Sequence, residues 1–128
     1  MSTRSQYIVV DETCLEETPI YIYKHWDGYP SAILPIILPF VEKFHKSRGN
    51  DSEYMRAQLL KALMGDCTDL DDFRGFGISD TIHDDIDYLY EIHSETGVVF
   101  VKTHRGEELG RFPLGTNAAK AVASLEGR

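Results

Sequence analysis

The chain has 128 residues, of which 42% are hydrophobic and 27% are charged, a composition that suits one globular domain with a single modest core rather than a disordered chain. With 13 Lys and Arg against 21 Asp and Glu, the net charge is −8, which disfavours direct nucleic-acid binding and suits a protein partner with a basic face. The acidity also has a simpler interpretation, in which it only keeps the protein soluble.

Segments that would direct the chain to a membrane are not apparent. No apolar run approaches the ~20 residues of a membrane span, and the first residues lack a hydrophobic signal region. We therefore expect a cytoplasmic protein without membrane contact, in the cytosol of the host cell if the protein is viral. Cys14 and Cys67 are too few for a disulfide framework and lack the spacing of a zinc site, so we expect two free thiols.

Two strands are predicted near the N-terminus. After a flexible leader over residues 1–5, the β-branched run Tyr7–Val10 predicts the first strand. Ile20–His25 predicts the second, because its isoleucines alternate with two tyrosines and a histidine that would lie on the opposite face. A polar loop separates these segments, and we expect them to pair antiparallel.

A helical pair is predicted in the middle of the chain. Trp26–Pro30 forms a turn in which Gly28 can adopt a positive φ, and Ser31 is a good N-cap for the helix that follows. Apolar residues at helical spacing extend this helix to Arg48-Gly49-Asn50. Pro39 requires either a kink or a later start.

The second helix is predicted to begin at Asp51 or Ser52 and to end at Gly65. The short connection between the two helices makes them antiparallel neighbours. Residues 66–85 then form an irregular acidic section, and within it the aromatic side chains of Phe73–Ile78 should fold the loop back onto the body of the protein.

The last third of the chain predicts three more strands. Ile86–His93 alternates between two faces, and Val98–Thr103 follows after a turn that contains Gly, so these segments form a hairpin. A short strand is expected over Leu109–Phe112, and residues 116–128 predict a weak helix or a flexible end. The order ββααβββ indicates an α+β fold with a mostly antiparallel sheet of about five strands and a helical pair on one face. We expect residues 1–128 to form this single domain.

Aromatic and polar side chains concentrate in the predicted turn after the second strand. His25 can exchange a proton near neutral pH, Asp27 can orient it, and the ring of Trp26 can stack on a planar ligand. The alternative is a structural corner, in which the polar groups bond to the backbone and the indole fills the core.

A second concentration lies in His83–Tyr90, where a histidine and three aspartates accompany two tyrosines. Carboxylates can bind a divalent cation, but the spacing matches no calcium loop, so we expect a solvated acidic segment and no metal site. Tyr88 and Tyr90 share one strand face and could form a pocket with the earlier tyrosines. The predicted ligand-binding residues are Tyr23, His25, Trp26, Asp27, Tyr88 and Tyr90.

Sequence motifs for catalysis are absent. The chain has no G-x-S-x-G, no phosphate-binding Gly-rich loop before a helix and no H-E-x-x-H. We therefore assign no catalytic residue and no cofactor, and an enzymatic function is disfavoured.

Two segments carry a resemblance to other proteins. Ile20–Pro30 matches the pattern I-Y-x-Y-x-H-W-D-G-Y-P, and His83–Tyr90 is of the kind H-x-D-x-Y-Y. The chain thereby resembles a set of small proteins from bacteria, phages and archaea. The resemblance implies the order strand, helical middle, strand and points to both motifs, but it implies no activity. Pro35 and Pro39 depart from the pattern of that set, whose members tend to have Gly and polar residues after the first motif.

Three classes of function follow from these features. The first is an acidic, phage-type interaction protein that inhibits a host protein, such as a defence protein with a nucleic-acid-binding surface, by matching its positive potential. The second is a binder of a small ligand such as a nucleotide, and the third is a metal-assisted hydrolase built on His25 and Asp27. Size, charge and the missing catalytic motifs favour the first class. The predicted partner-binding residues are Asp69, Asp71, Asp72, Asp80, Asp84 and Asp85.

Overall fold

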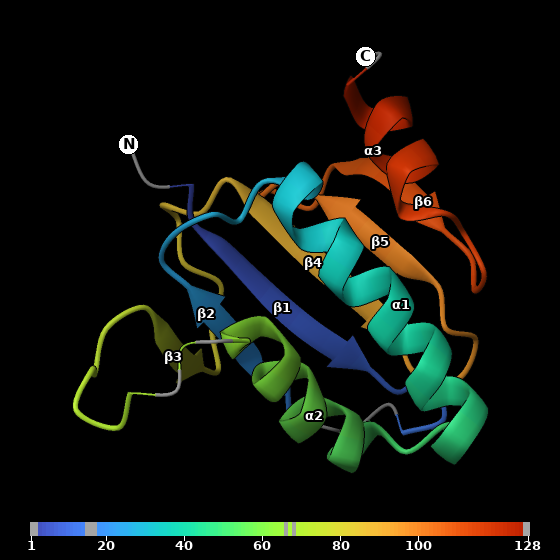
Figure 1. Ribbon diagram of the computed structural model, residues 1–128, viewed down its shortest axis with the longest axis horizontal. Helices are drawn as coiled ribbons and strands as arrows, with labels where there is room; N and C mark the ends of the chain where they lie inside the picture. The colour runs from blue at the N-terminus through green and yellow to red at the C-terminus, as the bar shows by residue number, and fades with distance from the viewer. Residues whose placement is uncertain (1–2, 15–17, 66, 68, 127–128) are drawn as a thin grey trace.

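A computed structural model describes residues 3–14, 18–65, 67 and 69–126. Over these residues the chain folds into six strands and three helices (Figure 1). In chain order the elements are β1 (Ser5–Val10), β2 (Tyr21–Lys24), α1 (Pro30–Arg48), α2 (Ser52–Met64), β3 (Phe76–Ser79), β4 (Tyr88–His93), β5 (Val99–Lys102), β6 (Glu108–Phe112) and α3 (Ala118–Glu126). The predicted α+β class is confirmed.

All six strands form one sheet in the order β3-β2-β1-β4-β5-β6. β1 and β4 lie parallel in the middle, and the other neighbouring pairs are antiparallel. The sheet is therefore mixed, and it has one strand more than the sequence predicts. The additional strand is β3, which lies inside the segment expected to be irregular. Gly77 and Ser79 are poor strand formers, so pairing with β2 rather than local propensity makes this segment a strand.

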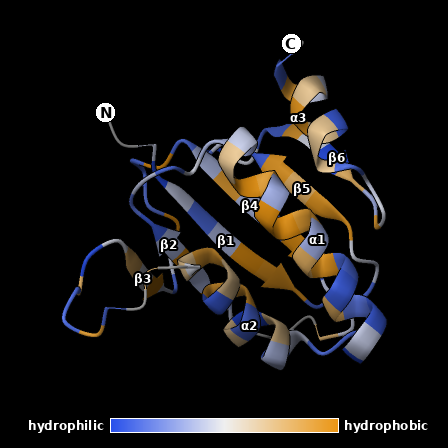
Figure 2. Ribbon diagram, viewed as in Figure 1, coloured by the Kyte–Doolittle hydropathy of each residue, from blue (hydrophilic) through white to orange (hydrophobic). Residues whose placement is uncertain are grey.

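The helices cover one face of the sheet (Figure 1). α1 packs between α2 and α3, with α2 against β1 and α3 against β6. Alternate residues of the strands face these helices, and Figure 2 shows the end of β1 and most of β5 as hydrophobic. The sheet contributes to the core Tyr7, Val9, Ile22, Tyr90, Ile92, Val99, Val101 and Phe112. Over the described residues, the opposite face carries no helix, and we call it the open face.

The start of α1 differs from the prediction. Its N-cap is Tyr29 rather than Ser31, and its first residue is Pro30. Proline suits this position because its fixed φ matches the helix and its missing N–H would have no helical partner there. Pro35 and Pro39 both lie inside the helix, which continues past them with its prolines on the exposed side.

The second helix agrees closely with the prediction. The side chain of Asp51, its N-cap, accepts a hydrogen bond from the N–H of Tyr54 at 3.4 Å, and Gly65 ends the helix. As expected from the short connection, α1 and α2 pack against each other. The predicted strands of the C-terminal third also form, with bounds that differ from the expected ones by one or two residues.

The two ends of the chain contain more regular structure than predicted. Ser5 belongs to β1, whereas the sequence predicts a flexible leader over residues 1–5, of which 1–2 lie outside the described residues. The expected weak helix forms as α3, and residues 127–128 lie outside the described residues. Within the described ranges, no helix combines the length and the apolar character that crossing a bilayer requires.

Candidate functional site

The turn after β2 is held by hydrogen bonds to distant parts of the chain. The N–H of Gly28 donates to the carbonyl oxygen of Thr3 at 3.0 Å, and the hydroxyl of Tyr90 donates to the carbonyl oxygen of Gly28 at 2.6 Å. A Cβ at position 28 would lie 2.4 Å from the hydroxyl oxygen of Ser5, so close packing requires glycine here. The positive φ expected at this glycine is instead at Asp27, with a value of 53°. These contacts support the structural interpretation of the turn.

Lys24 and Trp26 fasten the same turn to β3. Lys24 is only 6% exposed, and its ammonium group donates to the carbonyl oxygen of Trp26 at 2.6 Å. The ammonium group also lies 5.9 and 5.8 Å from the ring centres of Trp26 and Phe76, which meet each other edge-on. Burial lowers the pKa of Lys24, and the charge of Asp27 partly offsets this effect. The indole ring is therefore used for packing between the turn and β3.

The open face brings Tyr23, His25 and His83 together. The hydroxyl of Tyr23 and Nδ1 of His25 are 2.8 Å apart, and the ring of Tyr23 stacks on that of His83 with 4.8 Å between centroids. Burial raises the pKa of Tyr23, and the charge of Asp85 acts in the same direction. Asp85 in turn pairs with Arg4 at 2.9 Å. The cluster is thus a network whose polar groups bond to one another.

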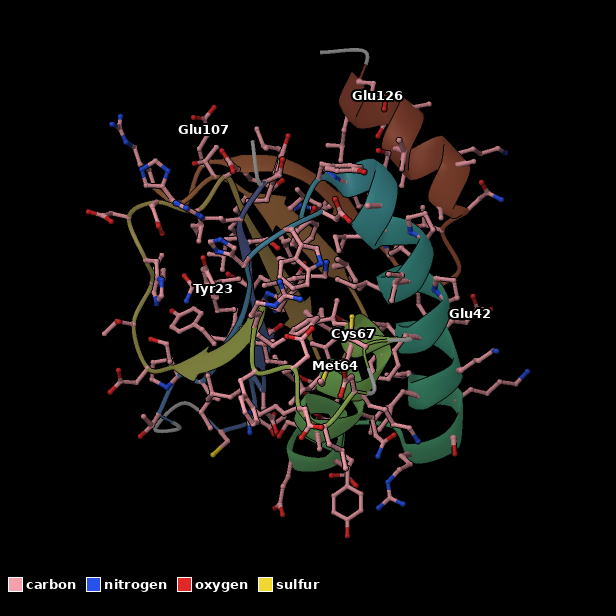
Figure 3. The ribbon with its side chains drawn as sticks, turned by 60° about the vertical axis from the view of Figure 1, so that its left-hand side comes forward. Tyr23, Glu42, Met64, Cys67, Glu107 and Glu126 are labelled. Carbon is pink, nitrogen blue, oxygen red and sulfur yellow. The ribbon has the colours of Figure 1, made fainter. Side chains whose placement is uncertain are left out.

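Tyr88 and Tyr90 do not share a pocket with Tyr23. Gln6 of β1 pairs with Tyr23 of β2, and the next residue of β1, Tyr7, pairs with Tyr90 of β4. Because neighbouring residues of a strand point to opposite faces, Tyr23 lies on the open face and Tyr90 lies under the helices. Figure 3 shows Tyr23 on the side of the sheet away from α1. The predicted ligand-binding residues are therefore divided between two faces and do not form one pocket.

A charged network on the open face was not anticipated from the sequence. Glu91 accepts a hydrogen bond from Lys102 at 3.0 Å and lies 2.7 Å from Nε2 of His93. The other ring nitrogen of His93 contacts the carboxylate of Glu12, and the ring packs on Phe100. The sequence signal was the spacing of Glu91 and His93, which places both on one strand face. Since these charged groups are paired with one another, we interpret the network as stabilising the sheet.

The predicted partner-binding aspartates lie in the two connections that flank β3. The loop between α2 and β3 carries Asp69, Asp71 and Asp72, and the connection from β3 to β4 carries Asp80, Asp84 and Asp85. The side chains of both groups are exposed. Because β3 is a terminal strand of the sheet, carboxylates lie at both ends of an open edge.

Local hydrogen bonds shape the loop before β3. The side chain of Asp69 accepts the N–H of Asp71 at 2.9 Å, and that of Asp72 accepts the N–H of Arg74 at 3.1 Å. Asp72 also pairs with the guanidinium of Arg74 at 2.9 Å. Hydrogen bonds from Arg74 lower the pKa of Asp72, so this carboxylate stays ionised at neutral pH.

Large apolar side chains are exposed among these aspartates. Leu70 is 90% exposed, Phe73 is 89% exposed and Ile78 is 62% exposed. The expectation that Phe73 folds back onto the body is wrong, whereas Phe76 packs against the core. We use the name β3 edge surface for the group formed by Asp69, Leu70, Asp71, Asp72, Phe73, Ile78, Asp80, Asp84 and Asp85.

A groove of about 550 Å³ lies between α2 and the acidic loop. Apolar residues of α2 line one side, and Leu70 and Asp72 line the loop side. A neighbouring cavity of about 300 Å³ shares Ala57 and Leu60 with this groove and extends to Ile78. Figure 3 shows the end of α2 and the start of the loop, where Met64 and Cys67 are labelled. The apolar surface therefore continues from the loop along α2 to β3.

Metal ligands and known relatives give no further indication of function. Within the described ranges, no group of three or more His, Cys, Asp or Glu side chains is arranged to hold a metal ion. Comparisons of the chain with models of known families, with curated proteins and with solved structures find no match. The function is therefore inferred from the surface of the protein itself.

Proposed function

We propose that the protein binds a basic surface of another protein through the β3 edge surface. The observation that carries this proposal is the exposure of Leu70 and Phe73, at 90% and 89%, in a loop that also holds three aspartates. Apolar side chains in water contribute nothing to the core, and a contiguous exposed group of them is typical of an interaction site. An aromatic side chain that enters a pocket of the partner commonly supplies much of the binding energy.

Charge selects the class of partner. The net charge is −8, and six exposed aspartates lie in the two connections that flank β3. Opposite charge on the partner speeds encounter, and like charge disfavours a second copy of this chain at the same surface. The expected partner is therefore a different protein, whose basic residues surround an apolar depression that accepts Phe73 and Leu70.

Inhibition is the consequence that we propose for this binding. Basic surfaces of this kind are used by proteins that bind nucleic acids. An acidic protein bound there neutralises the positive potential and excludes the phosphate backbone. The phage-type origin and a host defence protein as the target stay predictions.

The two alternatives have less support. A small ligand in the predicted aromatic pocket requires residues that the fold divides between two faces of the sheet. A hydrolase built on His25 and Asp27 requires Asp27 to orient the imidazole, whereas the group that lies against Nδ1 of His25 is the hydroxyl of Tyr23.

The first part of the test is a comparison of variants as baits in extracts of the native host. Leu70→Ser with Phe73→Ser removes the apolar anchors, and Asp69→Asn with Asp71→Asn and Asp72→Asn removes three charges. The control changes the net charge equally at exposed sites elsewhere, through Glu42→Gln, Glu95→Gln and Glu107→Gln. Figure 3 shows Glu42 and Glu107 away from β3.

The second part is a titration of the purified partner, defined as a protein that both the wild type and the control variant capture. We expect the anchor variant to raise Kd by about tenfold or more. The aspartate variant should slow association and weaken its dependence on salt, and the control should do neither to the same extent. All variants should melt near the wild-type temperature, because these side chains are exposed. An affinity that the anchor variant leaves unchanged contradicts the proposal.

A further inference from the structure

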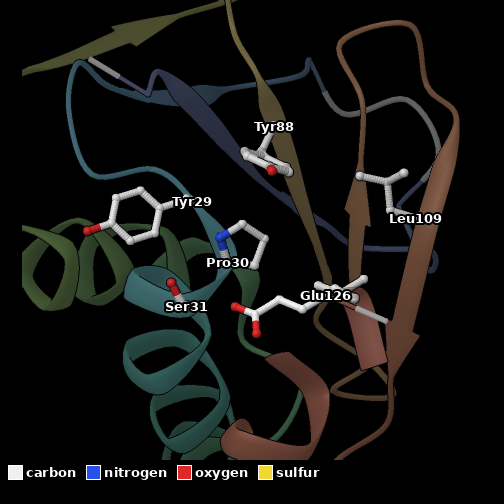
Figure 4. A pocket seen from close by; sticks show the side chains of 7 residues that line it. Tyr29, Pro30, Ser31, Tyr88, Leu109 and Glu126 are labelled. Atoms are coloured by element: carbon white, nitrogen blue, oxygen red, sulfur yellow. The ribbon is translucent and has the colours of Figure 1, made fainter. Parts of the chain in front are cut away.

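A cavity beside the start of α1 combines a carboxylate with tyrosine rings. It has a volume of about 330 Å³ and lies between the start of α1, Tyr88 of β4, Leu109 of β6 and the end of α3 (Figure 4). Figure 4 shows the carboxylate of Glu126 extending toward Pro30 and Ser31 across this space. A cavity of this size suits a small molecule or one long side chain.

A second cavity, of about 360 Å³, adjoins the first. Both are lined by Tyr29, Tyr88 and Leu109, and the second adds Asp87 and two threonines. The two cavities therefore form one continuous depression, which we call the tyrosine groove. Glu126 supplies a carboxylate to one part of it, and Asp87 supplies a carboxylate to the other.

The charged side chains of the tyrosine groove are acidic. Among the described residues that line its two parts, none is Lys, Arg or His. Asp87 accepts a hydrogen bond from the backbone N–H of Arg4 at 3.0 Å, through one carboxylate oxygen. In the described part of the chain, neither Asp87 nor Glu126 has a cationic side chain as a partner. The groove therefore presents two carboxylates without a cationic side-chain partner beside aromatic rings.

We propose that the tyrosine groove binds an alkylammonium group. The two carboxylates compensate the positive charge, and the faces of the tyrosine rings attract it by cation–π interaction. The side chains of Leu109 and Leu125 contact the methylene groups that carry the ammonium. This chemistry is shared by a free aliphatic diamine and by a lysine side chain of another protein.

An anionic ligand does not fit the same groove. α1 begins here, and the N-terminus of a helix attracts anions. The first residue of this helix is Pro30, which has no N–H to donate, and the carboxylate of Glu126 extends toward it. The local charge therefore favours a cation.

The inference goes beyond the proposed function and does not depend on it. The residues changed to test the β3 edge surface lie in the loop between α2 and β3, and none of them lines the tyrosine groove. The two proposals are therefore tested with separate variants.

The test is calorimetric titration of the whole protein at low salt with three probes. These are putrescine, Nα-acetyl-lysine methylamide and Nα-acetyl-norleucine methylamide, which has the aliphatic chain without the charge. We expect saturable binding of at least one amine, no binding of the neutral probe, and shifts of the methyl resonances of Leu109 and Leu125. Glu126→Gln and Asp87→Asn should each weaken amine binding by about tenfold. Glu42→Gln, which changes the net charge equally at an exposed site inside α1 that lines neither part of the groove, should leave it unchanged.

The outcomes separate the possible sources of the ammonium group. Tighter binding of putrescine indicates a free diamine, and tighter binding of the lysine derivative indicates a protein side chain; either result supports the proposal. Tyr88→Leu, which keeps an apolar wall but removes the ring face, should also weaken binding. The proposal is overturned if neither amine binds, if the neutral probe binds equally well, or if the two carboxylate variants bind as the wild type does.

Discussion

The indole ring of Trp26 lies so close to the backbone of Gly75 that a Cβ at position 75 would be 2.3 Å from its Cη2 atom. Beside this contact, the N–H of His25 donates to the carbonyl oxygen of Gly75 at 2.8 Å. Gly75 also has a φ of +96°, a conformation that other residues rarely adopt. The end of the acidic loop is therefore fixed to the turn after β2, which explains how a structural turn positions the β3 edge surface.

Gly75→Ala should destabilise the protein more than Gly106→Ala. Both glycines have a positive φ, +96° and +85°, which costs an alanine about 1–2 kcal/mol. No atom lies within 4 Å of a Cβ at position 106, so only Gly75→Ala adds a collision with the rigid indole, for about 1–3 kcal/mol more. Urea unfolding followed by the fluorescence of Trp26 measures both changes. Equal losses would show that the Trp26 contact does not constrain the loop.

Tyr90→Phe should lower the free energy of unfolding by about 1–3 kcal/mol. The hydroxyl of Tyr90 donates to the carbonyl oxygen of buried Gly28 at 2.6 Å, and the variant leaves this carbonyl without its donor. Tyr88→Phe is the matched control, because the hydroxyl of Tyr88 has no hydrogen bond in the described part of the structure. It should change stability by less than about 0.5 kcal/mol. Chemical denaturation distinguishes the two variants, and a similar effect of both would contradict the assigned role of the Tyr90 hydroxyl.

Stability should fall when the pH rises above about 10. Tyr7 and Tyr90 stack with 5.1 Å between ring centroids, and burial raises the pKa of both side chains. In the unfolded chain these tyrosines lose their protons near pH 10, about their ordinary pKa, whereas in the folded protein they keep them. The folded state therefore binds more protons above about pH 10, so the stability that is present below this pH is lost as the pH rises.

Lys24 has the opposite dependence over a lower range of pH. Burial lowers the pKa of Lys24 in the folded state. Lys24 therefore adds stability as the pH rises toward its pKa in the unfolded chain, about 10.4. Above that pH its contribution no longer changes. Urea unfolding between about pH 10.5 and pH 11.5 should therefore report mainly the tyrosines. The Tyr7→Phe variant lacks the ionisable hydroxyl at position 7, so its free energy of unfolding should fall less steeply with pH. A slope that this variant leaves unaltered would assign the alkaline loss to other groups.

Pro39→Ala should stabilise the protein. Pro39 lies inside α1 on its exposed side, where proline costs a helix about 3 kcal/mol relative to alanine. Without the proline the unfolded chain has more conformational entropy, which offsets up to about 1 kcal/mol of the increase in stability. The expected net increase in the free energy of unfolding is about 2 kcal/mol. Pro30→Ala, at the first helical position, is the control and should give no gain. If calorimetry shows a loss at position 39, the packing of α1 requires the shape that this proline imposes.

Local patterns in the sequence determined the elements that carry their own signals. The alternation of Ile86–His93 placed Tyr90 and Ile92 on one strand face, as the structure has them, and the structure adds that this face belongs to the core. Asp51 and Gly65 marked the ends of α2 because a side-chain acceptor and a glycine satisfy helix ends through contacts within a few residues. The acidic composition also placed six aspartates on the surface, because isolated carboxylates stay in water.

Only the tertiary structure decided how these elements face one another. β3 forms a strand because its backbone pairs with that of β2. β1 pairs parallel with β4, which the long connection between the two strands permits. The register at β1 places Tyr23 and Tyr90 on opposite faces, which no property of either strand alone determines. The tertiary structure also decides which aromatic side chain is buried: Phe76, at the start of β3, packs against the core, whereas Phe73 in the preceding loop remains exposed. Propensity and periodicity act within one segment, whereas pairing, register and burial depend on which distant segments meet.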